Sequence, residues 1–360
     1  MTPRSQTVTS NRVTMRDIAQ QAGVAVTTVS SALHNTGRVS PDLKQRIHDI
    51  ASQMGYRPKL AARLLRASKT GRLALIMIVG ANKGATVISQ SGSHGPIIAE
   101  FVSACSRMKV GFEIEYLESG KDQVAPECFT GGQADGALIC GQVNSPKLAK
   151  WFKDNAKQYP CVYLDHVGEY NVWNNTGLGI YNAVQHLAAL GHRQFAYLGV
   201  DSNYPVHRSG IDEFKRAVAD FQLDDQQGQW IKLISKQSGH NREQWIDEQL
   251  VNAQSLLTGQ NRPTAVIGQG VPDARCMVYA AMEKGLSVPR DLSIITYGMA
   301  ADAMKSPPCL HCVEPDFSTM VQSALNMLRA RLAGEAVAEK SVMVLPQLVE
   351  RRSVAAVCED

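Results

Sequence analysis

The chain has 360 residues, 44% of them hydrophobic, which is too long and too apolar for a single small domain. No uninterrupted apolar run reaches 18 residues and the first eleven residues are polar, so we expect neither a membrane span nor a secretory signal, and a cytoplasmic location. The net charge of +4 is uneven, because residues 1–72 carry +9 and the remainder −5. A basic head on an acidic body indicates a polyanionic partner for the first fifth of the chain, although charge alone also fits a solvated surface.

The eight cysteines are irregularly spaced and several stand in apolar runs, which is typical of reduced, buried thiols. Only Cys309 and Cys312 have metal-like spacing, with His311 between them. A structural zinc site needs four ligands and no second pair follows, so we expect two thiols in a core strand and leave a metal or redox role as the alternative. No metal or cofactor is therefore predicted.

The basic head contains three predicted helices. Thr14 can cap the first, and Gly23 stops it. After a turn of about three residues, a second helix spans about 26–35. The third begins with Ser40 as N-cap and Pro41 at the first helical position, and it ends at Gly55. Two helices joined by a tight turn and supported by a third predict a helix-turn-helix unit, whose second helix enters the major groove.

An ordered set of short motifs across these helices and the following segment resembles the head and hinge of the LacI/GalR family of transcription regulators. The motifs cover residues 13–19, 22–24, 28–30, 38–41, 55–58 and 61–65. The resemblance implies that Val26, Thr27 and Ser31 read base edges, although packing is an equal alternative for Val26. It also implies DNA contacts at Thr14, Thr28, His34, Arg38, Tyr56, Arg57, Ala62, Leu65 and Arg66. Ala25 stands where a capping serine is usual, at a cost of about 1 kcal/mol.

Residues 59–67 are good helix formers, but a helix of this length is too short to stay folded alone in water. In the resembling family this hinge folds on the operator, and a residue at the Leu65 position is wedged into a base step of the minor groove. A plain amphipathic linker is the alternative. The expected domains are a DNA-binding head at 13–58, a hinge at 59–70 and an effector-binding and dimerisation core at 71–353.

From residue 72 onward, predicted strands alternate with predicted helices. This pattern predicts parallel sheets covered on both faces, and eight strands fit two lobes better than one sheet. The expected fold class is α/β, with an all-α helix-turn-helix head and a periplasmic-binding-protein-like core of two Rossmann-like lobes. The strands are expected at 73–79, 112–117, 134–140, 161–164, 195–198, 230–234, 264–267 and 292–296, and the helices at 97–108, 145–157, 180–190, 208–221, 241–257 and 274–284.

Ligands of such sheets bind beyond the carboxyl ends of the strands, so an effector is expected between the lobes. Body motifs such as 186–193 with 195–199, 285–293 and 347–353 extend the resemblance over nearly the whole chain. Carboxylates common in relatives are missing, with Gly270 and Val271 in place of Asn-Asp. The expected effector is a small molecule, with a carbohydrate or derivative as one candidate. Its expected contacts are Arg208, Ser93, Asn175, Gln269 and Tyr297, a surface salt bridge being the alternative for Arg208.

The expected function is that of a ligand-responsive repressor, not an enzyme, that binds a pseudo-palindromic operator as a homodimer. Ligand binding between the lobes would shift DNA affinity, and DNA would shift ligand affinity equally. A transport-type binding protein that shares only the body is one rival, which the basic head disfavours. An enzyme is the other, disfavoured because no glycine-rich cofactor loop or nucleophile-base arrangement stands out.

Overall fold

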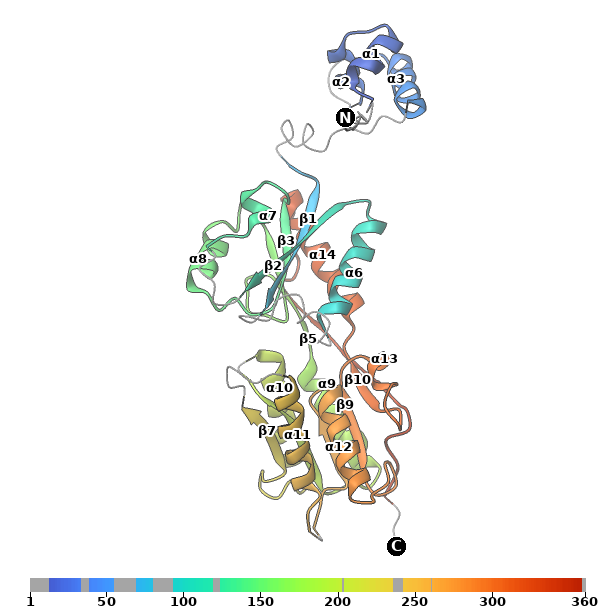
Figure 1. The fold of residues 1–360 in the computed structure, drawn as a ribbon. Helices are drawn as coiled ribbons and strands as arrows, with labels where there is room; N and C mark the ends of the chain where they lie inside the picture. The colour runs from blue at the N-terminus through green and yellow to red at the C-terminus, as the bar shows by residue number, and fades with distance from the viewer. Residues whose placement is uncertain are drawn as a thin grey trace, which may run out of the picture. The chain divides into compact units, whose positions relative to one another are not determined.

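The computed structural model describes residues 13–33, 39–54, 69–79, 93–118, 124–202, 204–235, 242–259 and 261–357. The chain forms two compact units, residues 1–70 and residues 71–360, called here the head and the body (Figure 1). Among the helices of the described ranges, none is both long enough and apolar enough to cross a membrane.

The head is a three-helix unit built from α1 (Met15–Ala22), α2 (Val26–Leu33) and α3 (Pro41–Gln53). Its small core takes one or more side chains from each helix, and Ile18, Val29 and Ile47 are completely buried. The ends of the helices follow the sequence signals. The Asp17 carboxylate accepts 2.7 Å hydrogen bonds from the Thr14 backbone N–H and hydroxyl, and Gly23 ends α1 with a φ of 68° that favours glycine.

Lobe 1 of the body is a six-stranded parallel sheet in the order β11-β5-β4-β3-β1-β2. One face is covered by α6 and α14, and the other by α7 and α8. Strand β1 is part of the core of this lobe, because all its residues from Leu73 to Val79 are buried. The elements are β1 (Arg72–Val79), α6 (His94–Arg107), β2 (Gly111–Glu118), α7 (Glu127–Thr130), β3 (Gly136–Cys140), α8 (Pro146–Asp154), β4 (Cys161–Leu164), β5 (Asn171–Asn174), α14 (Phe317–Ala333) and β11 (Ser341–Val344).

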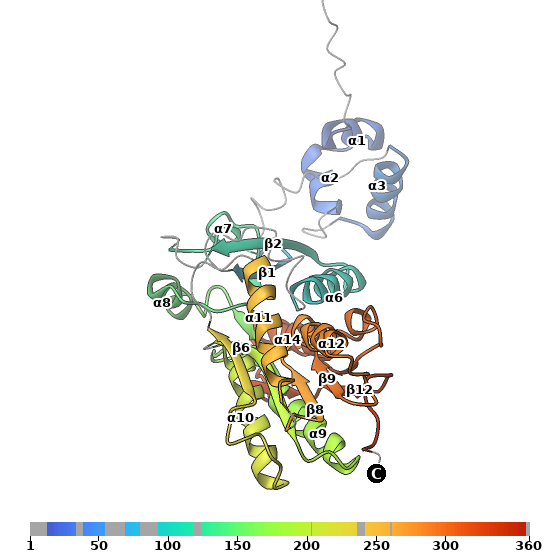
Figure 2. The ribbon, with the colours of Figure 1, turned by 60° about the horizontal axis from the view of Figure 1, so that its bottom comes forward.

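Lobe 2 is a second six-stranded sheet in the order β12-β10-β9-β8-β6-β7, parallel except that β12 runs antiparallel to β10. Helices α9 and α10 cover one face and α11 to α13 the other (Figure 2). The elements are α9 (Thr176–Ala189), β6 (Phe195–Asp201), α10 (Pro205–Asp220), β7 (Ile231–Ser235), α11 (Arg242–Leu256), β8 (Ala265–Gly268), α12 (Val271–Glu283), β9 (Ser293–Tyr297), α13 (Ala300–Ala303), β10 (His311–Glu314) and β12 (Gln347–Val349).

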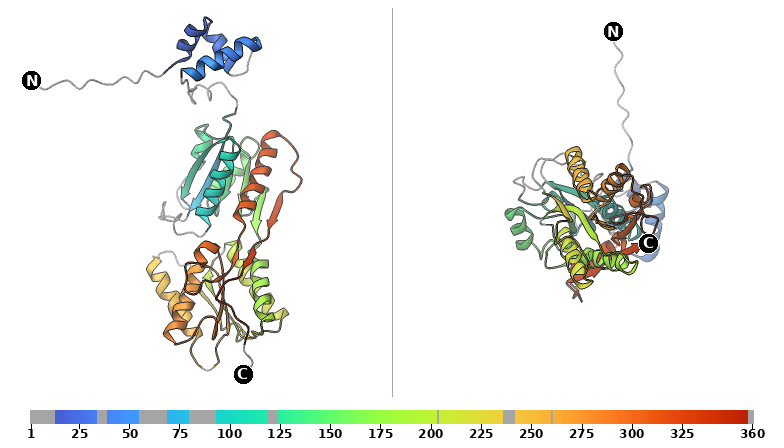
Figure 3. Two further views of the ribbon diagram at one scale, coloured as in Figure 1. Left: turned by 90° about the vertical axis from the view of Figure 1, so that its right-hand side faces the viewer. Right: turned by 90° about the horizontal axis from the view of Figure 1, so that it is seen from below.

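Three chain segments join the lobes. The chain leaves lobe 1 between β5 and α9, returns between β10 and α14, and leaves again between β11 and β12. The left view of Figure 3 shows these segments passing between the lobes. Each lobe is therefore assembled from segments that are far apart in the sequence.

The predicted fold class, an all-α head with two α/β lobes, is confirmed. All eight expected body strands and all six expected body helices occur, with shifted ends. Helix α10 begins at Pro205, three residues before the expected start, and α12 begins at Val271. Helices α13 and α14, the short α7 and the strands β5, β11 and β12 were not predicted, and β10 was expected only as a core strand around Cys309 and Cys312.

Candidate functional site

The outer surface of α2 is the candidate DNA-reading surface of the head. Val29 and Ala32 are buried in the core, whereas Val26 is 41% exposed and Thr27 is also exposed. Ser31 is half-buried. The exposure of Val26 means that core packing does not occupy its side chain, so an apolar surface is available there.

The start of α2 lacks a side-chain cap. The carbonyl oxygen of Ala25 accepts from the N–H groups of Thr28 and Val29, at 2.9 and 3.2 Å, so the helix begins at Val26 as expected. Thr28 is half-buried and Thr14 is exposed. The remaining DNA contacts implied by the resemblance lie outside the described residues and stay predictions: His34, Arg38, Tyr56, Arg57, Ala62, Leu65 and Arg66.

In the body, a cavity of about 90 Å³ lies at the carboxyl ends of the central strands, and we call it the strand-end pocket. Its lining comes from both lobes, with Cys140 from the end of β3 and Tyr297 from the end of β9. This is the position expected for a ligand of two parallel sheets. The lining includes three of the five predicted effector contacts, which are Ser93, Gln269 and Tyr297.

Two buried polar atoms of the strand-end pocket have no hydrogen-bond partner among the residues that the structure describes. The Gln269 side-chain oxygen accepts from the Val200 N–H, which fixes the amide, but its Nε2 has no partner. The hydroxyl of Tyr197, a completely buried residue of β6, also has none. Unpartnered buried polar groups cost about 1–3 kcal/mol each, so both atoms favour a polar ligand. Thr176, in contrast, donates to the Tyr297 hydroxyl at 3.1 Å.

Asp165, which directly follows β4, brings a carboxylate to the strand-end pocket. Its oxygens accept from the backbone N–H and side-chain amide of Asn174, at 2.7 and 3.3 Å. Burial raises the pKa of Asp165 to about 6, while the two bonds from Asn174 oppose the shift. Burial raises the pKa values of Tyr204 and Tyr297, and the negative charge of Asp165 adds to both shifts. The carboxylate and these two phenols therefore lie close together.

Three further pocket residues, Asp165, Tyr204 and His207, were not predicted from the sequence. The signal for Asp165 was present, because it follows a predicted strand at its carboxyl end. Tyr204 and His207 lie at and just inside the start of α10, which begins earlier than expected. Their rings make an edge-to-face contact at 5.5 Å, and His207 Nδ1 lies 2.8 Å from the Ser202 hydroxyl.

The other two predicted effector contacts do not line the strand-end pocket. Asn175 is the N-cap of α9, where its side-chain oxygen accepts from the Leu178 N–H at 3.1 Å. Arg208 is exposed in the first turn of α10. Their roles as effector contacts stay predictions.

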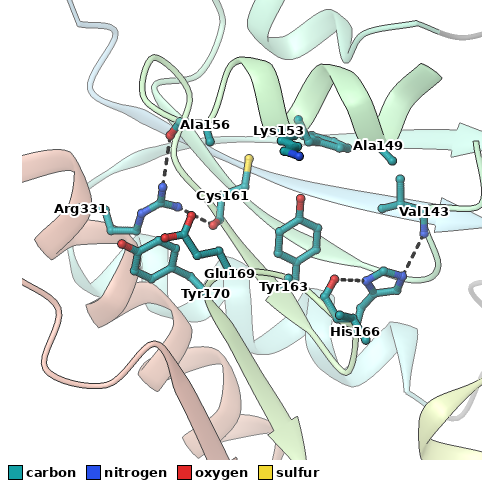
Figure 4. A pocket seen from close by; sticks show the side chains of 13 residues that line it. Val143, Ala149, Lys153, Ala156, Cys161, Tyr163, His166, Glu169, Tyr170 and Arg331 are labelled. Atoms are coloured by element: carbon teal, nitrogen blue, oxygen red, sulfur yellow. Dashed lines mark hydrogen bonds between the residues drawn. The ribbon is translucent and has the colours of Figure 1, made fainter. Parts of the chain in front are cut away.

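A larger cavity of about 290 Å³ lies within lobe 1, between α8, β4 and the loop after β4 (Figure 4). Arg331 of α14 donates to the carbonyl oxygens of Cys161 at 2.6 Å and Ala156 at 3.2 Å, and its guanidinium lies over the Tyr170 ring. His166 accepts from the Val143 N–H, so its other ring nitrogen donates to the carbonyl of its neighbour in the chain. These polar groups already have partners, which distinguishes this cavity from the strand-end pocket.

The suggested metal pair separates in the structure. Cys312 is buried in β10, while the Cys309 thiol donates to the carbonyl of Met304. Within the described ranges, no group of three or more His, Cys, Asp or Glu side chains could hold a metal ion. Burial and the nearby His186 lower the pKa of His311, between the two cysteines, to about 4.

Two family models match the chain. Residues 14–59 match the model described as "Bacterial regulatory proteins, lacI family", and residues 184–354 match "Periplasmic binding protein-like domain". The curated relatives include proteins named "HTH-type transcriptional repressor PurR". The one from Pectobacterium carotovorum subsp. carotovorum (strain PC1) is 26% identical, the match covering 95% of this chain and 97% of the relative, and the one from Escherichia coli O139:H28 is 25% identical with the same coverage.

The solved structures support the same fold. The lac repressor dimer bound to operator and the anti-inducer ONPF has a TM-score of 0.75 at 20% identity, over 96% of this chain and all of that chain. The complex of the transcriptional regulator CelR with cellobiose has a TM-score of 0.64 at 19% identity, over 95% of this chain and all of that one. With the two matched domains and relatives along nearly its whole length, this chain belongs to the LacI/GalR family of bacterial regulatory proteins.

Proposed function

We propose that this protein is a ligand-responsive transcription repressor that binds a pseudo-palindromic operator as a homodimer. The observation that carries the proposal is the combination of an exposed recognition helix on a strongly basic head with a polar pocket at the strand ends of a two-lobed body. The relatives named as transcriptional repressors match over the same length. The proposed division is a DNA-binding head at 13–58, a hinge at 59–70 and a core at 71–353.

The recognition surface on α2 is tested by adding a negative charge to it. Selection of bound duplexes from a randomised pool by the full-length protein supplies the operator. Thr27→Asp would place a carboxylate on the exposed face of α2, against the bases and phosphates, and we expect operator affinity to fall by at least about a hundredfold. Ser52→Asp makes the same charge change on the exposed surface of α3 and should cost far less. Equal losses in the two variants, measured by fluorescence anisotropy, would contradict recognition by α2.

The dimer surface is proposed on lobe 2, where large apolar side chains are exposed. Tyr279 and Met282 of α12 are 55% and 63% exposed, and Met304, just after α13, is 54% exposed. Arg275 of α12 donates to the Ser306 hydroxyl and to the carbonyl of Asp302, which holds this part of α12 against the segment around Met304. Such a cluster is typical of an interface between subunits.

A substitution separates this surface from another exposed helix. Met282→Glu should yield monomers in sedimentation velocity and weaken operator binding, because a dimer places two heads on two half-sites. Val251→Glu, at a position 62% exposed on α11, is the matched control and should stay dimeric. A dimeric Met282→Glu protein would rule out this surface.

Effector binding in the strand-end pocket is proposed to change the angle between the two lobes and so to alter the affinity of the head for DNA. DNA binding is then expected to alter the affinity for the effector by the same factor. Leu65 is proposed to wedge into a central base step, so Leu65→Ala should weaken specific binding much more than non-specific binding. Arg208→Ala should remove the effector response while leaving operator affinity intact. An unchanged response would eliminate Arg208 as an effector contact.

A further inference from the structure

The strand-end pocket contains a buried carboxylate that has no lysine or arginine partner among the described residues. Asp165 is only 7% exposed, and its carboxylate accepts hydrogen bonds from the neutral backbone N–H and side-chain amide of Asn174. Among the described residues that line the pocket there is no lysine or arginine. An ionised carboxylate in such surroundings is costly unless a positive charge accompanies it. The pocket therefore favours a ligand that supplies that charge.

The walls of the same pocket are rich in aromatic rings. Tyr197, Tyr204, Tyr297 and Phe317 all line it. The electron-rich faces of aromatic rings attract cations, and groups of such rings recognise organic ammonium ions. A carboxylate surrounded by aromatic rings suits a cation much better than it suits a phosphate or a carboxylate, which Asp165 would repel.

The unpartnered polar atoms add a second requirement. Gln269 Nε2 is a buried donor without an acceptor, and the Tyr197 hydroxyl is a second group without a partner. Both are satisfied by an oxygen atom on the ligand. The volume of about 90 Å³ is well below the roughly 300–1,000 Å³ of pockets for drug-sized ligands, so the ligand is compact.

We propose that the effector is a small organic cation that also carries a hydroxyl or carbonyl oxygen, such as an amino alcohol. In this assignment the ammonium group lies beside Asp165, among the tyrosine rings, and the oxygen accepts from Gln269. The assignment rests on the proposed function, because it names the ligand class of the proposed effector pocket. It differs from the expectation of a carbohydrate, which the sequence left open.

Calorimetric titrations of the full-length protein with compounds matched in size test this ligand class. Ethanolamine, ethylene glycol and glycolate differ mainly in charge, and choline has a neutral counterpart in 3,3-dimethylbutan-1-ol. We expect each cation to bind at least about tenfold more tightly than its neutral counterpart, a difference of about 1.4 kcal/mol. Glycolate should bind most weakly.

Two variants test the residues. Asp165→Asn keeps the shape of the side chain without its charge and should remove the preference for cations, whereas Asp154→Asn, at an exposed ion pair with Lys150 on α8, should retain it. Tyr204→Leu removes a ring but no charge, so it should weaken choline binding more than binding of the neutral counterpart. This second variant keeps the proposal testable if Asp165→Asn does not fold.

Operator binding without any added compound is measured in parallel, which separates the two proposals. A protein that binds cations but no DNA would overturn the repressor function and leave the ligand class standing. Three outcomes in a protein that binds its operator would overturn the ligand class alone. These are equal binding of cations and neutral counterparts, a preference for cations that survives Asp165→Asn, and no heat of binding with either cation at millimolar concentration.

Discussion

Arg331 joins three parts of lobe 1, and its replacement by alanine should lower the free energy of unfolding of the body by about 2–3 kcal/mol. The guanidinium donates two hydrogen bonds to backbone carbonyls, those of Cys161 and Ala156, and hydrogen bonds to charged groups contribute about 1.5–3 kcal/mol each. Its position 3.9 Å from the centre of the Tyr170 ring adds about 0.5–1 kcal/mol. Arg331 is half-buried beside an open cavity, so water can replace part of this loss.

Urea unfolding of the full-length protein, followed by tryptophan fluorescence, measures this loss. All four tryptophans lie in the body, and Trp151 belongs to α8, which borders the same cavity. Arg329→Ala is the matched control, because Arg329 is exposed on the same helix and its guanidinium lies 4.0 Å from the sulfur of Met108, a weak contact. A loss below about 1 kcal/mol in Arg331→Ala, or the same loss in both variants, would refute this account of Arg331.

Three further predictions concern the cores and the backbone. Burial raises the pKa of Asp273 to about 7, above the value of about 4 in an unfolded chain. Between these two values the folded state keeps a proton that the unfolded state releases, so the free energy of unfolding decreases as the pH rises from about 4 to about 7. The melting temperature should therefore fall less from pH 5 to pH 8 in Asp273→Asn than in the wild type, and equal falls would contradict this. Gly141→Ala should destabilise the body by at least about 2 kcal/mol, because its φ is +100° and the new methyl group would clash with the Ile78 carbonyl. Gly132→Ala is the control, with a φ of +62° and open space around the new methyl group, and it should cost about 1 kcal/mol. Similar losses in the two variants would argue against the clash. Ile47→Ala should cost the head about 2–5 kcal/mol, and hydrogen exchange should then speed up in the head but not in the body.

The sequence predicted the elements with strong local signals. Helix α3 is an example, because Ser40 and Pro41 mark its start, although the Ser40 side chain makes no capping hydrogen bond. Helix α14 was not predicted, despite Asp316 at its N-cap and Gly334 in a left-handed conformation at its end. Strands such as β5, with four residues and asparagine at both ends, have little local signal, since their partners come from distant segments.

Some residues of the strand-end pocket could be predicted because they follow strands that have a strong local signal in the sequence. The rule that ligands bind at the carboxyl ends of strands selected Gln269 and Tyr297, and both line the strand-end pocket, while their contacts with an effector stay predictions. Helix α10 starts at Pro205, a proline at the first helical position that the sequence prediction did not use as a start signal, and this earlier start brings Tyr204 and His207 to the pocket. Helix boundaries are the part of a sequence-based prediction that is least constrained by periodicity.

The three crossings between the lobes have a consequence for synthesis of the chain. Lobe 1 begins at residue 72 but needs α14 and β11, which the ribosome adds only after nearly all of lobe 2. Until then the apolar face of its sheet that α14 covers, including Leu138 and Val162, lacks its cover. Lobe 1 therefore cannot complete its folding before lobe 2 is synthesised, whereas an amino-terminal domain made from one continuous segment can. A nascent chain stalled before residue 317 has part of one sheet face, the part that α14 covers, exposed to water and to other chains.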